Sequence, residues 1–391
     1  MPRTSLHDVG VRRQLVALCA AVLVATGLSA CGHQDPPWTD LAWHAVSLPV
    51  PQGDRAMVRG ATWCDDRWVV VGALADARAH TRPAVWVSSD GKQWRTLALH
   101  PGDDYYAARA ILTSVGCSRG RLAVLGAKSG GAHGNPRTAT WRERRDGSLA
   151  AVPAAFELYG GPSAVAVSRL GGGPAGYLIV GTRASGAAVW TSRTGRSFRL
   201  LEGVGGLAST PQLRTQALDT VPWQGAWTVV GVSTDHSGRL TATAWSGSGD
   251  GPWTPTRLPG GSTITTAERL VATSAGPVTV GLVDNGFGVW ADRDGRWTQA
   301  STFGAADPAR TSAAYVSGVA WAGSLLAATY SDGVRFRLAI GPTRGLDVVP
   351  LPREVTVRGD HAVTVATHLD DTLLLTDDGE QGLVWLTRLP H

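Results

Sequence analysis

Arginine, acidic and tyrosine side chains recur in segments that lead into apolar runs, and together these residue types can bind an anion. Arg offers N–H donors in a planar fork that matches a carboxylate or a phosphate, and Tyr adds a hydroxyl. We expect these segments to meet around one opening and to hold an anionic group such as a sugar acid or a phosphate. The alternative is ordinary solvated arginine, the usual state of this residue. The candidate ligand-binding residues are Arg59, Asp104, Tyr105, Tyr106, Arg109, Arg310, Arg358 and Asp360.

Patterns typical of catalysis or metal binding are missing from the sequence. It has no Gly-x-Ser-x-Gly turn, no His-Glu-x-x-His and no Cys-x-x-Cys, and its 10 histidines are scattered. The acidic pairs at 370–371 and 377–378 favour solvated turns over a calcium loop. We therefore predict no catalytic residue, no metal and no cofactor. The net charge of +5 is spread without a basic run, which argues against nucleic acid as a partner.

The first thirty residues have the pattern of an export signal. Arg12 and Arg13 precede an apolar run over residues 15–28, which is shorter than the roughly 20 residues needed to span a bilayer. The run ends in Leu-Ser-Ala-Cys-Gly, with the cysteine at position 31. This ending resembles the lipobox of bacterial lipoproteins, which implies cleavage before Cys31 and attachment of a diacylglyceryl group to its sulfur. The alternative is an ordinary signal peptide with a chance cysteine.

The lipobox resemblance implies an address for the mature chain. Residues 1–30 would be removed, and residues 31–41 would form a short tether from the membrane. Two acyl chains give stable anchoring, so we expect a lipid-anchored protein on the extracytoplasmic face of the cell membrane. Among the 36 basic residues, only Lys92 and Lys128 are lysines, a bias typical of a GC-rich genome. We therefore expect a high-GC Gram-positive (actinobacterial) source.

A repeat of about fifty residues fills the rest of the chain. Seven apolar runs end in a small residue, and successive ends are 47 to 55 residues apart. In six copies a strand ending in tryptophan follows, and in the sixth copy Leu338 takes that place. Hairpin turns such as Asp90-Gly91 come next in most copies. A strand also precedes each run, for example at 108–115. The final residues of the seven runs are Gly72, Gly126, Gly181, Gly231, Gly281, Thr329 and Thr376.

Four short strands in each of seven copies predict a β-propeller with seven blades. A pair of β-sandwiches with coincidental spacing is the alternative. The last copy lacks a fourth strand, whereas residues 40–49 match the fourth strand of the fourth copy in their Asp, Trp, Leu and Pro. We expect this N-terminal segment to complete the last blade, because an open ring would leave an unpaired edge. The predicted propeller covers residues 42–391 and is expected to be a monomer.

Two cysteines of this region occupy equivalent positions in neighbouring copies. Cys64 and Cys117 stand eight and nine residues before Gly72 and Gly126. Equivalent positions of neighbouring blades are close in space, and export to an oxidising compartment favours a disulfide between them. Two buried thiols are the alternative.

The turn Ser-Ser-Asp-Gly-Lys-Gln-Trp at 88–94 resembles the Asp box of sialidase-type (BNR) propellers, although it lacks one residue between Asp and Gly. In that family the box is a structural hairpin on the face opposite the active site, with the Asp capping the turn. The resemblance therefore supports the fold and says little about catalysis. Residues 57–60 read Met-Val-Arg-Gly where that family has an Arg-Ile-Pro motif, and no pair of carboxyl groups suited to glycoside cleavage stands out.

We therefore expect binding rather than catalysis: a scaffold for an envelope protein or glycan, held at the membrane. The alternative is a sialidase-like glycoside hydrolase or lyase that acts on an anionic sugar, and a third possibility is a purely structural or assembly factor. An enzyme predicts acidic groups that converge in the channel mouth. A binding module predicts an exposed apolar or aromatic patch.

Overall fold

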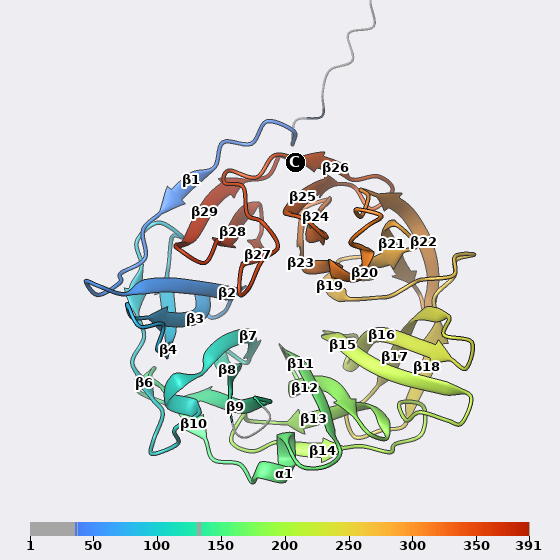
Figure 1. Ribbon diagram of the computed structural model, residues 1–391, viewed down its shortest axis with the longest axis horizontal. Helices are drawn as coiled ribbons and strands as arrows, with labels where there is room; N and C mark the ends of the chain where they lie inside the picture. Colours follow the sequence, from blue (N-terminus) through green and yellow to red (C-terminus); the bar gives the residue numbers. More distant parts are fainter. Residues whose placement is uncertain (1–35, 37, 131–133, 391) are drawn as a thin grey trace, which may run out of the picture. The chain divides into compact units, whose positions relative to one another are not determined.

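The computed structural model describes residues 36, 38–130 and 134–390, so the predicted lipid attachment site Cys31 lies outside the described residues. From Trp38 onward these residues belong to one compact unit. It is a ring of seven β-sheets, which confirms the predicted seven-bladed propeller (Figure 1). None of the helices in the described part has the length and apolar character needed to cross a bilayer.

Each blade runs from an inner strand at the channel to an outer strand at the rim. Blade 1 is β2 (Arg55–Trp63), β3 (Trp68–Ala75), β4 (Thr81–Ser88) and β5 (Arg95–Thr96). Blade 2 is β7 (Ile111–Ser118), β8 (Arg121–Ser129), β9 (Pro136–Glu143) and β10 (Leu149–Val152). Blade 3 is β11 (Ala164–Gly173), β12 (Gly176–Arg183), β13 (Gly186–Ser192) and β14 (Arg199–Leu201). Blade 4 is β15 (Leu213–Trp223), β16 (Ala226–Asp235), β17 (Leu240–Gly247) and β18 (Trp253–Arg257).

The remaining three blades follow the same order. Blade 5 is β19 (Arg269–Thr273), β20 (Gly276–Val283), β21 (Gly286–Arg293) and β22 (Arg296–Phe303). Blade 6 is β23 (Ala314–Ala322), β24 (Leu325–Asp332), β25 (Phe336–Gly341) and β26 (Asp347–Val349). Blade 7 is β27 (Ala362–His368), β28 (Asp371–Asp377), β29 (Gly382–Arg388) and, from the other end of the chain, β1 (His44–Val46).

The N-terminal strand closes the ring as predicted. β1 pairs antiparallel with β29, and Ala45 stands opposite Trp385. The hydroxyl of Thr387 also donates a hydrogen bond to the backbone oxygen of Ala42 at 2.9 Å. The last blade therefore has the four strands that the repeat requires, and the outer edge of β29 is covered.

Two local details differ from the expectation. The strand predicted from residue 108 begins at Ile111, because residues Ala107–Arg109 form a short 3-10 helix, η1. The second sheet also has a fifth strand, β6 (Leu99–His100), which pairs parallel with β10. Besides η1, the helical segments among the described residues are α1 (Phe156–Tyr159) and a second 3-10 helix, η2 (Thr311–Ala313).

The apolar runs form the second strand of each blade, and both of their faces are buried. On β3, Val70 packs toward blade 7, whereas Val69 and Val71 pack toward blade 2. The core is accordingly divided into slabs, one between each pair of neighbouring blades. This arrangement explains why these strands are apolar throughout, instead of alternating with polar residues.

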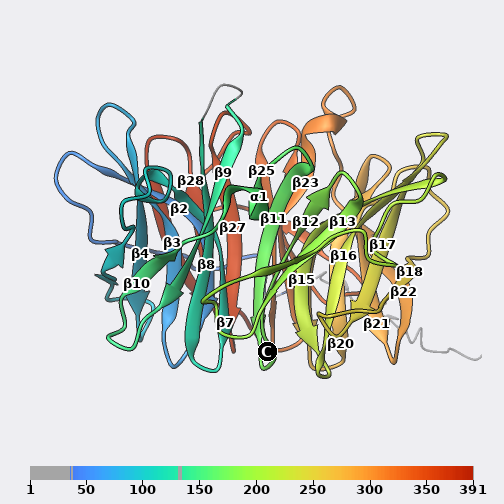
Figure 2. The same cartoon turned by 90° about the horizontal axis from the view of Figure 1, so that it is seen from below.

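The ring has two faces. Inner strands start at the upper face and end at the lower face, with the upper face at the top of Figure 2. Segments that connect one blade to the next cross the upper face. The lower face carries the turns between the first and second strands of each blade and, in blades 1 to 6, those between the third and fourth strands. One of these is the turn at 88–94, where Asp90 Oδ1 accepts hydrogen bonds from the backbone N–H groups of Lys92 and Gln93, both at 2.8 Å.

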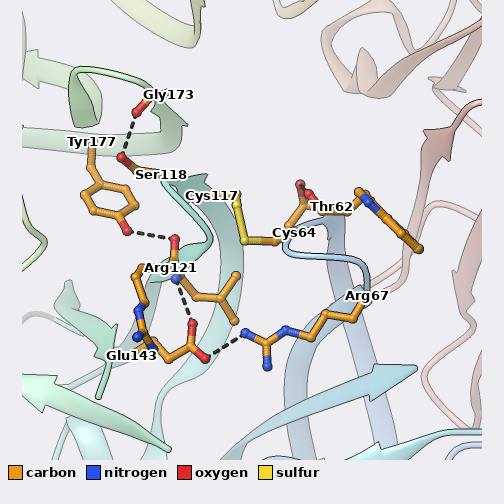
Figure 3. The surroundings of a disulfide bond; sticks show 11 residues. Thr62, Cys64, Arg67, Cys117, Ser118, Arg121, Glu143, Gly173 and Tyr177 are labelled. Atoms are coloured by element: carbon orange, nitrogen blue, oxygen red, sulfur yellow. Dashed lines mark hydrogen bonds and ion pairs between the residues drawn. A yellow bond between two sulfur atoms is a disulfide. The ribbon is translucent and has the colours of Figure 1, made fainter. Parts of the chain in front are cut away.

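The predicted disulfide is present at the junction of blades 1 and 2. Cys64 and Cys117 are bonded, with their Cα atoms 5.6 Å apart (Figure 3). The same junction holds an ion pair between Arg67 Nη2 and Glu143 Oε1 at 2.6 Å. Glu143 also accepts a hydrogen bond from the backbone N–H of Leu122. The turn that enters the second strand of blade 1 is thus attached to blade 2 by a covalent and an ionic contact.

Candidate functional site

The predicted ligand-binding residues all lie on inner strands or on the upper-face segments that lead into them, but they form separate groups. Arg59 and Asp360 lie together where blades 7 and 1 meet. Tyr105, Tyr106 and Arg109 lie together in front of blade 2. Arg310 and Arg358 are exposed, and within the described residues their side chains make no hydrogen bond or ion pair.

The first group is an ion-pair cluster. Arg59 Nη1 contacts Asp377 Oδ2 at 2.5 Å, and its Nη2 donates to the backbone oxygen of Asp360 at 2.7 Å. Arg55, four residues earlier on β2, contacts the carboxylates of both Asp360 and Asp377 at 3.4 Å. The side chain of Asp377 is fully buried. The prediction of a solvated turn at 377 was therefore wrong, because two arginines from blade 1 neutralise this carboxylate within the last junction of the ring.

The second group joins exposed aromatic rings with guanidinium groups. Arg109 lies 4.0 Å from the ring centre of Tyr105, and Tyr106 packs edge-on against the same ring at 5.3 Å. Arg137, at the upper end of β9, lies 4.4 Å from the ring centre of Phe156 and 5.7 Å from that of Tyr106. We call these five residues the aromatic–arginine cluster. Arg137 and Phe156 were not predicted. Phe156 is a single aromatic residue in a connecting segment and Arg137 a single arginine at the start of a strand, so neither belongs to a pattern that indicates a site.

The turn that presents this cluster is held by an acidic residue. Asp104 Oδ1 accepts hydrogen bonds from the backbone N–H groups of Tyr106 at 2.7 Å and Ala107 at 3.0 Å. Asp104 thus acts within the loop, where it fixes the start of η1. A cavity of about 250 Å³ beside the cluster is lined by Asp104, Tyr106, Arg137, Phe156 and Tyr159, among others.

The upper face also carries most of the exposed apolar side chains. Of the seven large hydrophobic residues that are exposed in the described part of the chain, five lie on segments that start an inner strand of blades 2 to 5. Tyr105 is 58% exposed and Phe156 is 52% exposed, which is enough for both rings to contact a partner. The five residues are Tyr105, Phe156, Val165, Leu213 and Ile264.

A second cavity, of about 390 Å³, occupies the central channel and was not predicted. Residues from all seven inner strands line it, from the middle of each strand toward the lower face. Its charged lining residues are Arg169, Asp219 and Arg269 from blades 3, 4 and 5. Arg169 Nε lies 3.7 Å from Asp219 Oδ1. Arg269 donates from Nε to the backbone oxygen of Ser317 at 3.1 Å.

Burial changes the proton affinities of the groups in and above this cavity. Loss of solvent, and then the like charge of Arg169, lower the pKa of Arg269 to about 10, so it stays protonated at neutral pH. Burial also raises the pKa of Glu268, although hydrogen bonds from the backbone N–H of Val316 and the hydroxyl of Thr266 oppose this effect. Tyr315 has a raised pKa for the same reason, loss of solvent. Among the described residues, no group of three or more His, Cys, Asp or Glu side chains could hold a metal ion.

No family model and no curated protein matches this chain. Solved structures do match it. The endosialidase of phage phi92 superposes with a TM-score of 0.52 at 9% identity, over 90% of this chain and 70% of that one. The β-propeller domain of the Trilobed protease from Pyrococcus furiosus gives 0.47 at 8% identity, over 86% and 96%. A Trypanosoma rangeli sialidase gives 0.40 at 12% identity, and 86% of this chain matches about half (55%) of that longer protein.

At these identities the likeness shows the fold alone. The chain is a seven-bladed β-propeller, and an endosialidase is among its structural neighbours.

Proposed function

We propose that this protein is an extracytoplasmic binding module that uses its upper face to hold an envelope protein or glycan. The observation that carries the proposal is the aromatic–arginine cluster. Tyr and Arg are enriched among residues that dominate binding energy, and aromatic rings give large contact areas at little cost in conformational entropy. The adjoining 250 Å³ cavity offers a recess for one side chain or sugar unit of the partner.

The arrangement of acids supports binding over glycoside cleavage. Asp360 and Asp377, at the junction of blades 7 and 1, share Arg55 and Arg59 as ion-pair partners. The sialidase-like alternative rests on Tyr315, which lies near Glu268 and Arg269. However, both carboxylate oxygens of Glu268 already accept hydrogen bonds, from Thr266 at 2.9 Å and Val316 at 2.6 Å. Within the described residues the Tyr315 hydroxyl makes no hydrogen bond to this carboxylate, whereas a nucleophile and its base are expected within hydrogen-bond distance of each other.

The position of the first described residues supports an orientation at the membrane. Trp38 donates from Nε1 to Asp347 Oδ2 at 3.0 Å, at the lower end of β26. Six residues lie between Cys31 and Trp38, so the distance between their Cα atoms is at most roughly 25 Å. If Cys31 carries lipid, as the lipobox resemblance implies, the lower face would be toward the bilayer. The upper face with its aromatic–arginine cluster would then look outward to a partner.

The test is retention of envelope components by the lipidated protein. Detergent-solubilised envelope would be passed over the wild-type protein, a Tyr105→Ala/Phe156→Ala variant and, as the control, Leu369→Ala, which removes a 75% exposed side chain from the lower face. We expect the same protein or glycan to be retained by wild type and control, and at least tenfold less by the double variant. Equal retention by all three would refute the proposal, as would cleavage of sialic acid glycosides by the purified protein. Unchanged glycan binding by Arg59→Ala/Arg109→Ala would exclude those two arginines.

A further inference from the structure

The central channel has one charged side and one small, neutral side. One residue of each inner strand belongs to a ring at the same level of the channel, because it pairs with an equivalent position on the second strand of its blade. The second-strand partners are Val71, Leu125, Val180, Val230, Val280, Thr329 and Leu375. Blades 3, 4 and 5 place Arg, Asp and Arg in this ring, whereas the other four blades place Gly, Ser, Gly and Thr. In order around the ring the residues are Gly60, Ser114, Arg169, Asp219, Arg269, Gly318 and Thr364.

The acid in this ring, Asp219, is held by hydrogen bonds from backbone N–H groups. Asp219 Oδ2 accepts a hydrogen bond from the backbone N–H of Leu270 at 3.0 Å, and Oδ1 accepts from that of Thr220 at 2.9 Å. Its contact with Arg169, at 3.7 Å, is longer than a hydrogen bond. Asp219 therefore joins blades 4 and 5 and only partly balances the two arginines.

The two arginines keep donors that face the cavity. Arg269 uses Nε and Nη1 for the backbone oxygens of Ser317 and Glu268. Arg169 makes no hydrogen bond within the described part of the chain, and none of its nitrogens is a buried atom without a partner, so they are open to the channel. Two guanidinium groups thus face one space in a site with little solvent. There, a bound anion would relieve their repulsion.

We propose that the channel cavity binds a small molecule through a phosphate or carboxylate group held by Arg169 and Arg269. The volume of about 390 Å³ lies in the range of small-molecule sites, and three small lining residues, Gly60, Ser114 and Thr364 of blades 1, 2 and 7, leave room for the body of the ligand. At the lower end Trp63 stacks on His368 at 3.8 Å, and Trp321 also lines the cavity, so flat surfaces border the exit. This site lies at the opposite end of the ring from the aromatic–arginine cluster and does not depend on the proposed partner.

Two sources of such an anion have access to the lower end of the cavity. A soluble phosphate or carboxylate can diffuse in, whereas a lipid headgroup can reach it if the lower face is toward the bilayer. Both place the same chemistry between the two arginines. The experiment therefore uses inorganic phosphate and succinate as soluble probes, glucose as the uncharged control, and vesicles of phosphatidylglycerol or phosphatidylcholine as lipid probes.

Titration calorimetry and vesicle flotation on the wild-type protein, Arg169→Gln, Arg169→Lys and Arg214→Gln test the proposal. Arg214 is an exposed arginine on an inner strand outside the cavity and serves as the control. We expect at least one anionic probe to bind the wild type and Arg214→Gln equally, and Arg169→Gln about 10- to 100-fold more weakly. Arg169→Lys should fall between, because it keeps the charge but loses the fork. Binding of phosphate or succinate indicates a soluble ligand, and selective flotation with phosphatidylglycerol indicates a headgroup. No binding of any anionic probe, or binding unchanged in Arg169→Gln, overturns the proposal.

Discussion

The indole N–H group of a blade tryptophan links the blade to the connecting segment that precedes it. In four blades this group donates to a backbone oxygen on the segment that arrives from the preceding blade. These segments lead into inner strands and form the upper face. The tryptophan therefore fills the space between sheets and fixes the chain that carries the candidate binding residues. The donors are Trp86, Trp190, Trp245 and Trp290, and their acceptors are Pro49, Leu158, Gly206 and Pro259.

The contribution of this hydrogen bond can be isolated by a matched pair of substitutions. Trp245 Nε1 donates to the backbone oxygen of Gly206 at 2.8 Å, whereas the equivalent Nε1 of Trp141 is buried and has no hydrogen-bond partner among the described residues. Tryptophan to phenylalanine removes similar ring area at both sites but breaks a hydrogen bond only in Trp245→Phe. Urea unfolding should show Trp245→Phe to be less stable than Trp141→Phe by about 1–3 kcal/mol. Equal losses would mean that the indole acts through packing alone.

His368 predicts how stability depends on pH. Its ring stacks on Trp63, and loss of solvent lowers its pKa below 6.5, although Asp371 and Asp66 oppose the shift. Below pH 6.5 the unfolded chain therefore takes up a proton before the folded chain does, and this destabilises the fold. We expect the melting temperature to fall between pH 7.5 and 5.5, and to fall less in His368→Phe. The same fall in both proteins would show that other groups control this range.

At the scale of the strand, the glycine that ends most apolar runs has a structural cause. In five blades the inner strand contains a β-bulge where it pairs with the end of the second strand, and the chains come close there. A Cβ on Gly72 would overlap the backbone oxygen of Met57, and one on Gly231 that of Gln216. Blade 7 pairs without a bulge at this point, and Thr376 occupies the position. The bulge and the glycine thus occur together in blades 1 to 4, whereas blade 6 has the bulge with Thr329 and blade 5 has Gly281 without a bulge between β19 and β20.

Gly231→Ala tests this relation. Because the new methyl group would meet backbone atoms, we expect a loss of about 1–3 kcal/mol or more in unfolding free energy, measured by urea denaturation. Gly205→Ala is the control, since a Cβ there meets nothing within 4 Å. It should leave stability unchanged or slightly raised. A neutral Gly231→Ala would contradict the close approach at the bulge.

The same bulges explain what could be predicted from the sequence and what could not. Recurrent glycines and tryptophans predicted seven blades and the N-terminal closure, because every blade repeats the packing contacts that require these residues. The channel site was missed for a different reason. Arg169 and Arg269 stand at equivalent positions, each 12 residues before the glycine that ends the apolar run of its blade, but the sequence does not show which side chains of an inner strand face the channel, because a bulge changes the alternation. The partner of Arg59 was missed for another reason: Asp377 is 318 residues away, and only ring closure brings the two together.

At the scale of the molecule, a disulfide, an ion pair and hydrogen bonds join each pair of neighbouring blades around the channel. Blades 1 and 2 share the disulfide, and blades 7 and 1 share the Arg59–Asp377 ion pair. Between them, side chains reach the backbone of the adjacent blade. These contacts come from Ser114 (to blade 3), Ser168 (to blade 4), Asp219 (to blade 5), Arg269 (to blade 6) and, in the reverse direction, Thr367 (from blade 7 to blade 6).

The disulfide should stabilise the ring measurably. It closes a loop between residues 53 apart in sequence, and cross-links of this kind contribute about 2–4 kcal/mol. Cys64→Ser/Cys117→Ser should therefore unfold at lower urea concentration than the oxidised wild type. Reduction of the wild type should reproduce most of that difference, and the same reductant should leave the variant unchanged. Equal midpoints for all samples would show that the Arg67–Glu143 contact and the apolar slab suffice at this junction.

Closure by the N-terminal strand is the claim on which the ring depends, and native-state amide hydrogen exchange tests it most directly. The amide protons of β1 that face β29 should be protected and should exchange in the same cooperative opening as those of β28 and β29. Exchange of the β1 amides at the rate of an unstructured peptide, while β28 and β29 stay protected, would contradict a ring sealed by its two ends.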